Sequence, residues 1–157
     1  MPTPEFILAL REKIGHDLLW LPGVTGIVLN DDDHVLLAQR VTNGRWGLVA
    51  GILEPGEQPA IGLAREILEE TGIEARVESL VSMETLPPSA YPNGDKVQYL
   101  DLTFRCRAIA GEARVNDDES LDVGWFAPDT LPDIPPRELR NIKEALRGPT
   151  TPHFLTT

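Results

Sequence analysis

The chain has 157 residues, which suits one domain with a single hydrophobic core. Its hydrophobic content of 41% argues against a disordered chain, and its formal net charge of −11 argues against binding to nucleic-acid polymers or to a membrane surface. Cys106 is the single cysteine, so the sequence offers neither an internal disulfide nor a cysteine-based zinc site. No signal peptide and no apolar run of about 20 residues is recognisable, so we expect a cytoplasmic protein.

The first half of the chain predicts a helix, a hairpin and a second helix. An apolar stripe on Phe6, Ile7, Leu10 and Ile14 predicts an N-terminal helix over residues 4–14. Residues 24–29 and 35–40 read as strands of a hairpin, and the aspartates at 31–33 are interpreted as its solvated turn. A short strand at 48–49 precedes a helix that starts near Gln58 and stops at Gly72.

The second half predicts strands at 73–83, 97–109 and 121–126, then a helix at 137–147. A proline-rich loop at 86–95 separates the first two strands. We expect one domain over residues 1–148 and a flexible C-terminal tail at 149–157. Strands between helices predict the α/β class with a mixed sheet.

The helix within residues 51–73 carries an unusual cluster of acids. Glu66, Glu69 and Glu70 have i, i+3, i+4 spacing and share one helix face. The opposite face is predicted to be apolar and to carry Ala60, Ile61, Ala64, Ile67 and Leu68. Three glutamates alone are more often a solvated helix face, but oxygen-rich clusters also suit Mg²⁺ or Mn²⁺.

The flanking residues favour the metal interpretation. Nine constrained positions follow the order Gly51, Glu57, Arg65, Glu66, Ile67, Glu69, Glu70, Gly72 and Ile73. This segment resembles the signature box of the Nudix hydrolases, and the element order extends the resemblance over roughly residues 20–147. One departure is Val49-Ala50-Gly51 at the entrance to the box, where many members have Pro-Gly-Gly.

The resemblance implies a fold, a reaction and a set of site residues. The fold would be an α/β/α sandwich with a mixed β-sheet between helices. The reaction would be Mg²⁺- or Mn²⁺-dependent hydrolysis of a nucleoside diphosphate derivative. Glu66 and Glu70 would be the principal metal ligands, with Glu69 and the backbone carbonyl of Ala50 as further ligands. Arg65 would orient the glutamates with Glu57 as its partner, and the general base would be Glu66 or Glu119.

The substrate is left open between ADP-ribose-like compounds and (deoxy)nucleoside triphosphates. Pro88 resembles an ADP-ribose marker and Tyr91 a diadenosine polyphosphate marker, and the two conflict. The second motif of the subgroup that acts on NADH is missing. Arg40 and Arg45 are candidates for phosphate contact, and Trp46, Tyr91, Tyr99 and Trp125 for base stacking. The alternative is a catalytically silent nucleotide-binding or regulatory module, and we expect a homodimer.

Overall fold

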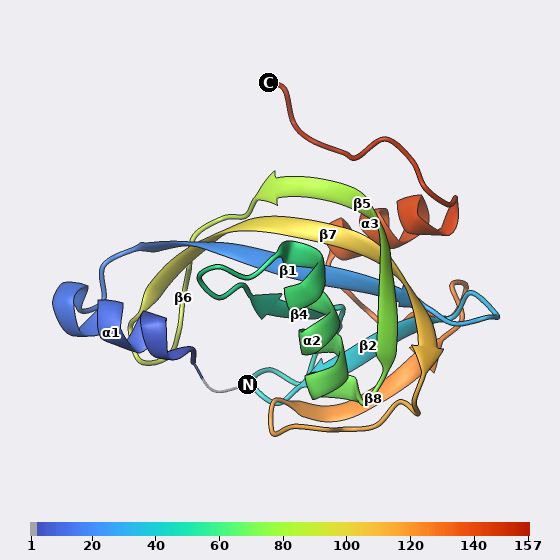
Figure 1. The fold of residues 1–157 in the computed structure, drawn as a ribbon, viewed down its shortest axis with the longest axis horizontal. Helices are drawn as coiled ribbons and strands as arrows, with labels where there is room; N and C mark the ends of the chain where they lie inside the picture. The colour runs from blue at the N-terminus through green and yellow to red at the C-terminus, as the bar shows by residue number, and fades with distance from the viewer. Residues whose placement is uncertain (1–2) are drawn as a thin grey trace.

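The computed structural model describes residues 3–157 (Figure 1). The elements in chain order are α1 (Glu5–Ile14), β1 (Leu19–Leu29), β2 (Val35–Arg40), β3 (Trp46–Gly47), β4 (Val49–Ile52), α2 (Pro59–Thr71), β5 (Glu74–Thr85), β6 (Ser89–Ala90), β7 (Lys96–Ala110), β8 (Ser120–Phe126) and α3 (Pro136–Leu146). All of the predicted elements are present, and the helices agree with the prediction to within a residue at each end.

The strands form one mixed sheet, as predicted. Its main path is β3-β2-β1-β7-β5; β4 pairs with β1, β6 with β7 and β8 with β2. β1 and β7 are parallel along their whole contact, whereas the other pairs are antiparallel. The predicted hairpin is confirmed by the antiparallel pairing of Leu29 with Val35. Its acidic turn at 31–33 is exposed, as expected.

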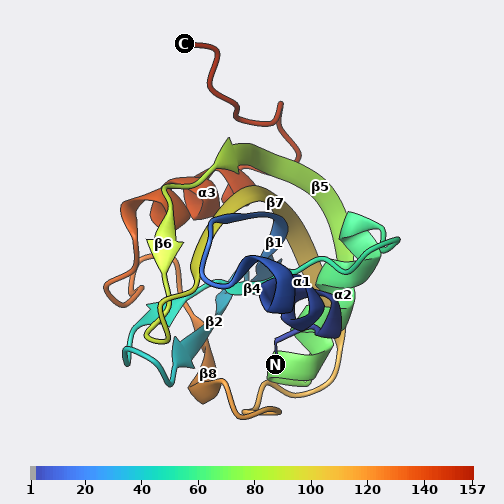
Figure 2. The ribbon, with the colours of Figure 1, turned by 90° about the vertical axis from the view of Figure 1, so that its left-hand side faces the viewer.

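The sheet lies between two helices, so its strands are buried on both faces. In β1, Val24 and Val28 belong to the apolar cluster beneath α2, whereas Ile27 and Leu29 belong to the cluster beneath α3. This alternation is the two-residue period of a strand. Figure 2 shows α2 and α3 on opposite sides of β1 and β7. The predicted α/β/α sandwich is therefore confirmed.

β1 is longer than the sequence predicts. It begins at Leu19, and its pairing with β7 continues through Pro22 and Gly23. Pro22 has no N–H to donate, but its carbonyl accepts a hydrogen bond from the N–H of Leu53 at 3.1 Å. The extra length carries β1 to a third apolar cluster, in which Leu21 packs with Ile7 of α1.

The polar face of β7 is buried under α3. Asp101 and Thr103 are 4% and 0% exposed. Asp101 accepts a hydrogen bond from Thr25 at 2.8 Å and pairs with Arg137 of α3 at 2.6 Å. Arg137 also pairs with Glu84 of β5 at 2.7 Å. Ion pairs therefore fix α3 on the sheet in addition to its apolar stripe.

The chain after α3 runs along β5. The N–H of His153 donates to the carbonyl of Val81 at 2.8 Å, and the N–H of Met83 donates to the carbonyl of His153 at 3.0 Å. The flexibility of residues 149–157 stays a prediction. Within residues 3–157, no helix combines the length and the apolar character that crossing a membrane requires.

Candidate functional site

The junction of β4 and α2 places Glu66 against the backbone of Gly51. A Cβ atom on Gly51 would lie 2.3 Å from Cδ and 2.4 Å from Cγ of Glu66. Gly51 has no positive φ angle, so glycine is required here by space and not by backbone conformation. A Cβ atom on Gly62 would likewise lie 2.7 Å from Cδ of Glu57. Two glycines therefore make room for two box carboxylates.

The buried stripe of α2 contains acids as well as apolar residues. Leu63, Glu66, Ile67 and Glu70 have i, i+3, i+4, i+7 spacing and are all buried, with Glu66 at 0% and Glu70 at 2% exposure. The predicted apolar face was wrong in part, because Ile61 is 66% exposed and Leu68 is 45% exposed. Two glutamates thus occupy positions that a purely structural helix would fill with apolar side chains.

Arg65 joins three of the box glutamates. Its guanidinium contacts Glu57 through two parallel bonds, Nε to Oε1 at 2.8 Å and Nη2 to Oε2 at 3.1 Å. Its Nη1 contacts Glu66 at 3.0 Å and Glu69 at 3.2 Å. The two-bond geometry is one that lysine cannot reproduce. Arg65 therefore links Glu57, Glu66 and Glu69 through ion pairs, and its orienting role stays a prediction.

The loop between β7 and β8 brings further carboxylates to Glu70. The N–H of Asn116 donates to the carbonyl of Glu70 at 3.2 Å, and its side-chain amide donates to the carbonyl of Leu68 at 3.1 Å. Both carbonyls belong to the last turn of α2, and that of Leu68 also accepts the N–H of Gly72 at 3.0 Å. The following residues, Asp117 and Glu119, each place a carboxylate oxygen within 4.8 Å of one on Glu70.

Burial shifts the protonation of the two central glutamates. It raises the pKa of Glu66 to about 7, although the charge of Arg65 opposes the shift. It also raises the pKa of Glu70 to about 7, where the charge of Arg40 opposes the shift and that of Asp117 adds to it. By contrast, the hydrogen bond from Arg65 holds the pKa of Glu57 below its ordinary value. The positive charges of Arg65 and Arg40 therefore only partly offset the cost of burying the ionised forms of Glu66 and Glu70.

The donor set fits a divalent cation. Oε2 of Glu66 is buried and has no hydrogen-bond partner within residues 3–157. A carboxylate oxygen without a donor is costly to bury. One carboxylate oxygen each from Glu70, Asp117 and Glu119 lies within 4.8 Å of the others, close enough for the three to share an ion. Hard cations such as Mg²⁺ prefer such all-oxygen surroundings.

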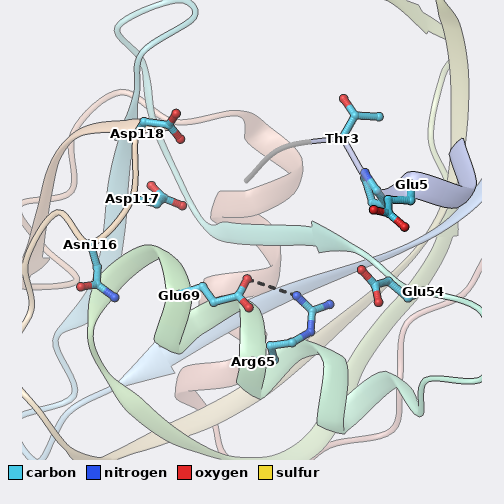
Figure 3. A pocket seen from close by; sticks show the side chains of 9 residues that line it. Thr3, Glu5, Glu54, Arg65, Glu69, Asn116, Asp117 and Asp118 are labelled. Atoms are coloured by element: carbon cyan, nitrogen blue, oxygen red, sulfur yellow. Dashed lines mark hydrogen bonds and ion pairs between the residues drawn. The ribbon is translucent and has the colours of Figure 1, made fainter. Parts of the chain in front are cut away.

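A pocket of about 670 Å³ opens beside these residues. Figure 3 shows its walls: Thr3 and Glu5 at the start of α1, Glu54 in the loop before α2, Arg65 and Glu69 on α2, and Asn116, Asp117 and Asp118 in the β7–β8 loop. Arg65 and Glu69 face one another across its floor, joined by their ion pair. Most of the lining is acidic, so the pocket favours cations or a ligand that arrives with them.

The residues predicted to contact the substrate lie in different parts of the structure. Arg40 donates through Nη2 to the carbonyl of Leu48 at 3.1 Å, and Arg45 is exposed. Trp46 is half-buried and packs edge-on against Phe126, with ring centroids 4.8 Å apart.

Tyr91 and Tyr99 lie beside the turn before β7. The hydroxyl of Tyr91 bonds to that of Tyr99 at 2.9 Å, and its N–H donates to Asp95. Among residues 3–157, no recorded interaction joins Tyr91 to the box acids. Of the predicted substrate residues, Arg40 lies close enough for its charge to act on Glu70, and all of these roles stay predictions.

Sequence reasoning missed two residues. The sequence points to Glu119 and not to Asp117, although the run 117–119 is acidic at every position. Glu138 of α3 carried no signal at all, because it reads as an ordinary first-turn acid. In the structure its Oε2 accepts a hydrogen bond from the N–H of Leu48 at 2.9 Å.

Two curated proteins show the level of sequence similarity. A MutT-like protein of Streptomyces ambofaciens is 37% identical over 108 residues, which cover 69% of this chain and 64% of that protein. The 8-oxo-dGDP phosphatase NUDT18 of Homo sapiens is 35% identical over 112 residues, covering 69% of this chain and 33% of that protein. The chain therefore spans less than two thirds of either relative.

Solved structures show the same fold. A NUDIX hydrolase from Nitrosomonas europaea superposes with a TM-score of 0.66 at 26% identity, covering 85% of this chain and 93% of that chain. A UDP-X diphosphatase superposes with a TM-score of 0.66 at 23% identity, covering 92% of this chain and 71% of that chain. The NUDIX domain model matches residues 20–146, which include every box position, and the chain therefore belongs to the Nudix family.

Proposed function

We propose that the protein is a divalent-metal-dependent pyrophosphohydrolase of nucleotide derivatives. The observation that carries the proposal is the cluster of carboxylate oxygens from Glu70, Asp117 and Glu119, which lie within 4.8 Å of one another. The charge of Glu66 acts on Glu70, and its buried Oε2 has no hydrogen-bond partner among residues 3–157. A catalytically silent binding module would have no need for two buried acids with raised pKa values. The intact site therefore favours an enzyme over the silent module.

The chain's own residues suit this reaction. Glu66, Glu69 and Glu70, with the carbonyl of Ala50, would hold Mg²⁺ or Mn²⁺, and Asp117 extends this set. A bound cation would polarise phosphoryl oxygens and lower the pKa of a bound water. Glu119 would accept the proton of the attacking water, with Glu66 as the alternative base. Arg65 and Glu57 would keep the acids aligned.

The proposed substrates are nucleoside diphosphate derivatives, either ADP-ribose-like compounds or (deoxy)nucleoside triphosphates. Relatives that act on 8-oxo-dGDP and a neighbour described as a UDP-X diphosphatase support a nucleotide diphosphate as the common unit. Arg40 and Arg45 would contact phosphate, and Trp46 or Tyr91 would stack on the base. Cytoplasmic location and a homodimer remain predictions, the latter testable by sedimentation velocity.

A nucleotide panel tests the proposal. We expect hydrolysis of at least one among 8-oxo-dGDP, ADP-ribose, UDP-sugars and the deoxynucleoside triphosphates, with Mg²⁺ or Mn²⁺ and not with EDTA. Glu70→Gln should lose orders of magnitude in turnover while its circular dichroism spectrum stays native. Glu74→Gln, an exposed control just after α2, should keep full activity. If no nucleotide of the panel is hydrolysed with either metal, the proposal that the protein is an enzyme is refuted.

The role of Glu119 needs its own variant. Glu119→Gln keeps the shape of the side chain and removes its basicity. If Glu119 is the base, turnover should fall by about 10²–10⁴-fold. Unimpaired turnover in this variant would assign the base to Glu66.

A further inference from the structure

The chain changes strand partners within a single residue just before the box. Gly47 of β3 pairs with Ala38 of β2, whereas Val49 of β4 pairs with Gly26 of β1. Leu48 lies between the two strands, and its side chain is 1% exposed. Backbone groups at such a buried crossing need partners from outside the strand ladders.

Two side chains bind the backbone of Leu48 from opposite sides. Its N–H donates to Oε2 of Glu138 at 2.9 Å, and its carbonyl accepts from Nη2 of Arg40 at 3.1 Å. Gly47 leaves room for this arrangement, because a Cβ atom there would lie only 3.3 Å from Oε2 of Glu138. Glu138 comes from the first turn of α3, 90 residues further along the chain.

Leu48 lies on the stretch of backbone that leads into the proposed metal site. Ala50, whose carbonyl is a proposed metal ligand, follows two residues later, opposite Thr25 of β1. Gly51 comes next and packs directly against Glu66. β4 is only four residues long, so a shift at Leu48 would move both the carbonyl of Ala50 and the backbone that supports Glu66.

We propose that Glu138 and Arg40 form a clamp on the Leu48 backbone that positions the carbonyl of Ala50 at the metal site. Glu138 is then a positioning residue, because its side chain has the length that brings Oε2 to the N–H of Leu48. Its charge is not required. This inference rests on the proposed function, because it assumes that the cation lies beside Ala50 and Glu66. It also gives α3 a part in the chemistry although that helix carries none of the proposed ligands.

Two conservative variants separate this role from direct contact with substrate. Glu138→Gln keeps an acceptor oxygen at the same reach and removes the charge. Glu138→Asp keeps the charge and shortens the side chain by one methylene. If Glu138 acts by reach, the glutamine variant should stay close to wild type, and the aspartate variant should weaken metal binding and turnover. If Glu138 acts by charge on the substrate, the order reverses.

The measurement is the affinity for Mn²⁺ by electron paramagnetic resonance without substrate, together with kcat and KM on the best panel nucleotide. We expect Glu138→Asp to lose about 10–100-fold in Mn²⁺ affinity or in kcat, the range for groups that support metal ligands. Glu144→Gln on the solvent side of α3 is the matched control. The amide of Leu48 should also exchange faster with solvent in Glu138→Asp than in Glu138→Gln.

These measurements distinguish a failure of the clamp from a failure of the proposed function. Wild-type protein that binds no Mn²⁺ would overturn the metal site and the clamp together. Wild-type protein that binds Mn²⁺, with an aspartate variant that binds it equally well and keeps its kcat, would overturn the clamp alone. A glutamine variant more impaired than the aspartate variant would also overturn it and would assign Glu138 to substrate.

Discussion

Replacing Gly51 by alanine should disrupt the site without removing any of its functional groups. The new Cβ atom would lie 2.3 Å from Cδ and 2.7 Å from Oε1 of Glu66, far inside van der Waals contact. Glu66 is fully buried and held by Arg65, so it cannot simply rotate into solvent. Overpacking of this kind lowers the free energy of unfolding by about 1–3 kcal/mol. For a domain of this size, each kcal/mol lowers the melting temperature by about 2–4 °C.

The assay is urea unfolding of a double-mutant cycle, which needs no enzymatic activity. Gly51→Ala should be costly in the wild-type background and nearly neutral in a Glu66→Ala background, because the clashing atoms are then absent. Gly124→Ala is the control, since a Cβ atom there would meet Phe126 at an ordinary 3.6 Å. An equal cost of Gly51→Ala in both backgrounds would refute the reasoning.

Three further outcomes follow from the contacts. Arg65→Lys should lower turnover by about 10–100-fold through loss of its two-bond pairing, whereas the exposed Arg76→Lys should have little effect. In EDTA, the free energy of unfolding should fall as the pH rises from 4.5 through about 7. Burial raises the pKa of Glu66 and Glu70, so in this range the folded state binds more protons than the unfolded state. Urea unfolding over a pH series checks this, and the variant with Glu66→Gln and Glu70→Gln should lack the slope. Arg137→Met, which removes the partner 2.6 Å from a buried aspartate, should cost about 3 kcal/mol by urea unfolding, and a cost near zero would contradict the network.

Local signals were enough to locate α2. Pro59 suits a first helical turn, and Gly72 has the left-handed conformation that ends helices, with φ of 73°. The box spacing identifies the family, and the structure gives a physical reason for several of its constrained positions. Gly51 leaves space, Arg65 makes ion pairs, and Glu66 and Glu70 supply oxygens.

Contacts between residues far apart in the sequence could not be predicted from local sequence patterns. A helical wheel assigns Ile61 and Leu68 to the core, but the structure buries Glu66 and Glu70 instead. Glu66 packs against Gly51 of β4, and the β7–β8 loop covers the end of α2 at Glu70. The role of Glu138 depends on a contact between residues 90 positions apart, which periodicity cannot reveal. Such partners emerge only when the sheet and α3 are assembled.

The acidic stripe of α2 has a consequence for how this protein could evolve. Glu66 and Glu70 occupy core positions at which an apolar side chain would pack without the penalty of burying a carboxylate. A variant that did not need the proposed catalysis would therefore gain stability from residues such as leucine or methionine at these positions. The two acids stand here at the expense of a more stable fold, which is the trade-off expected of a functional site.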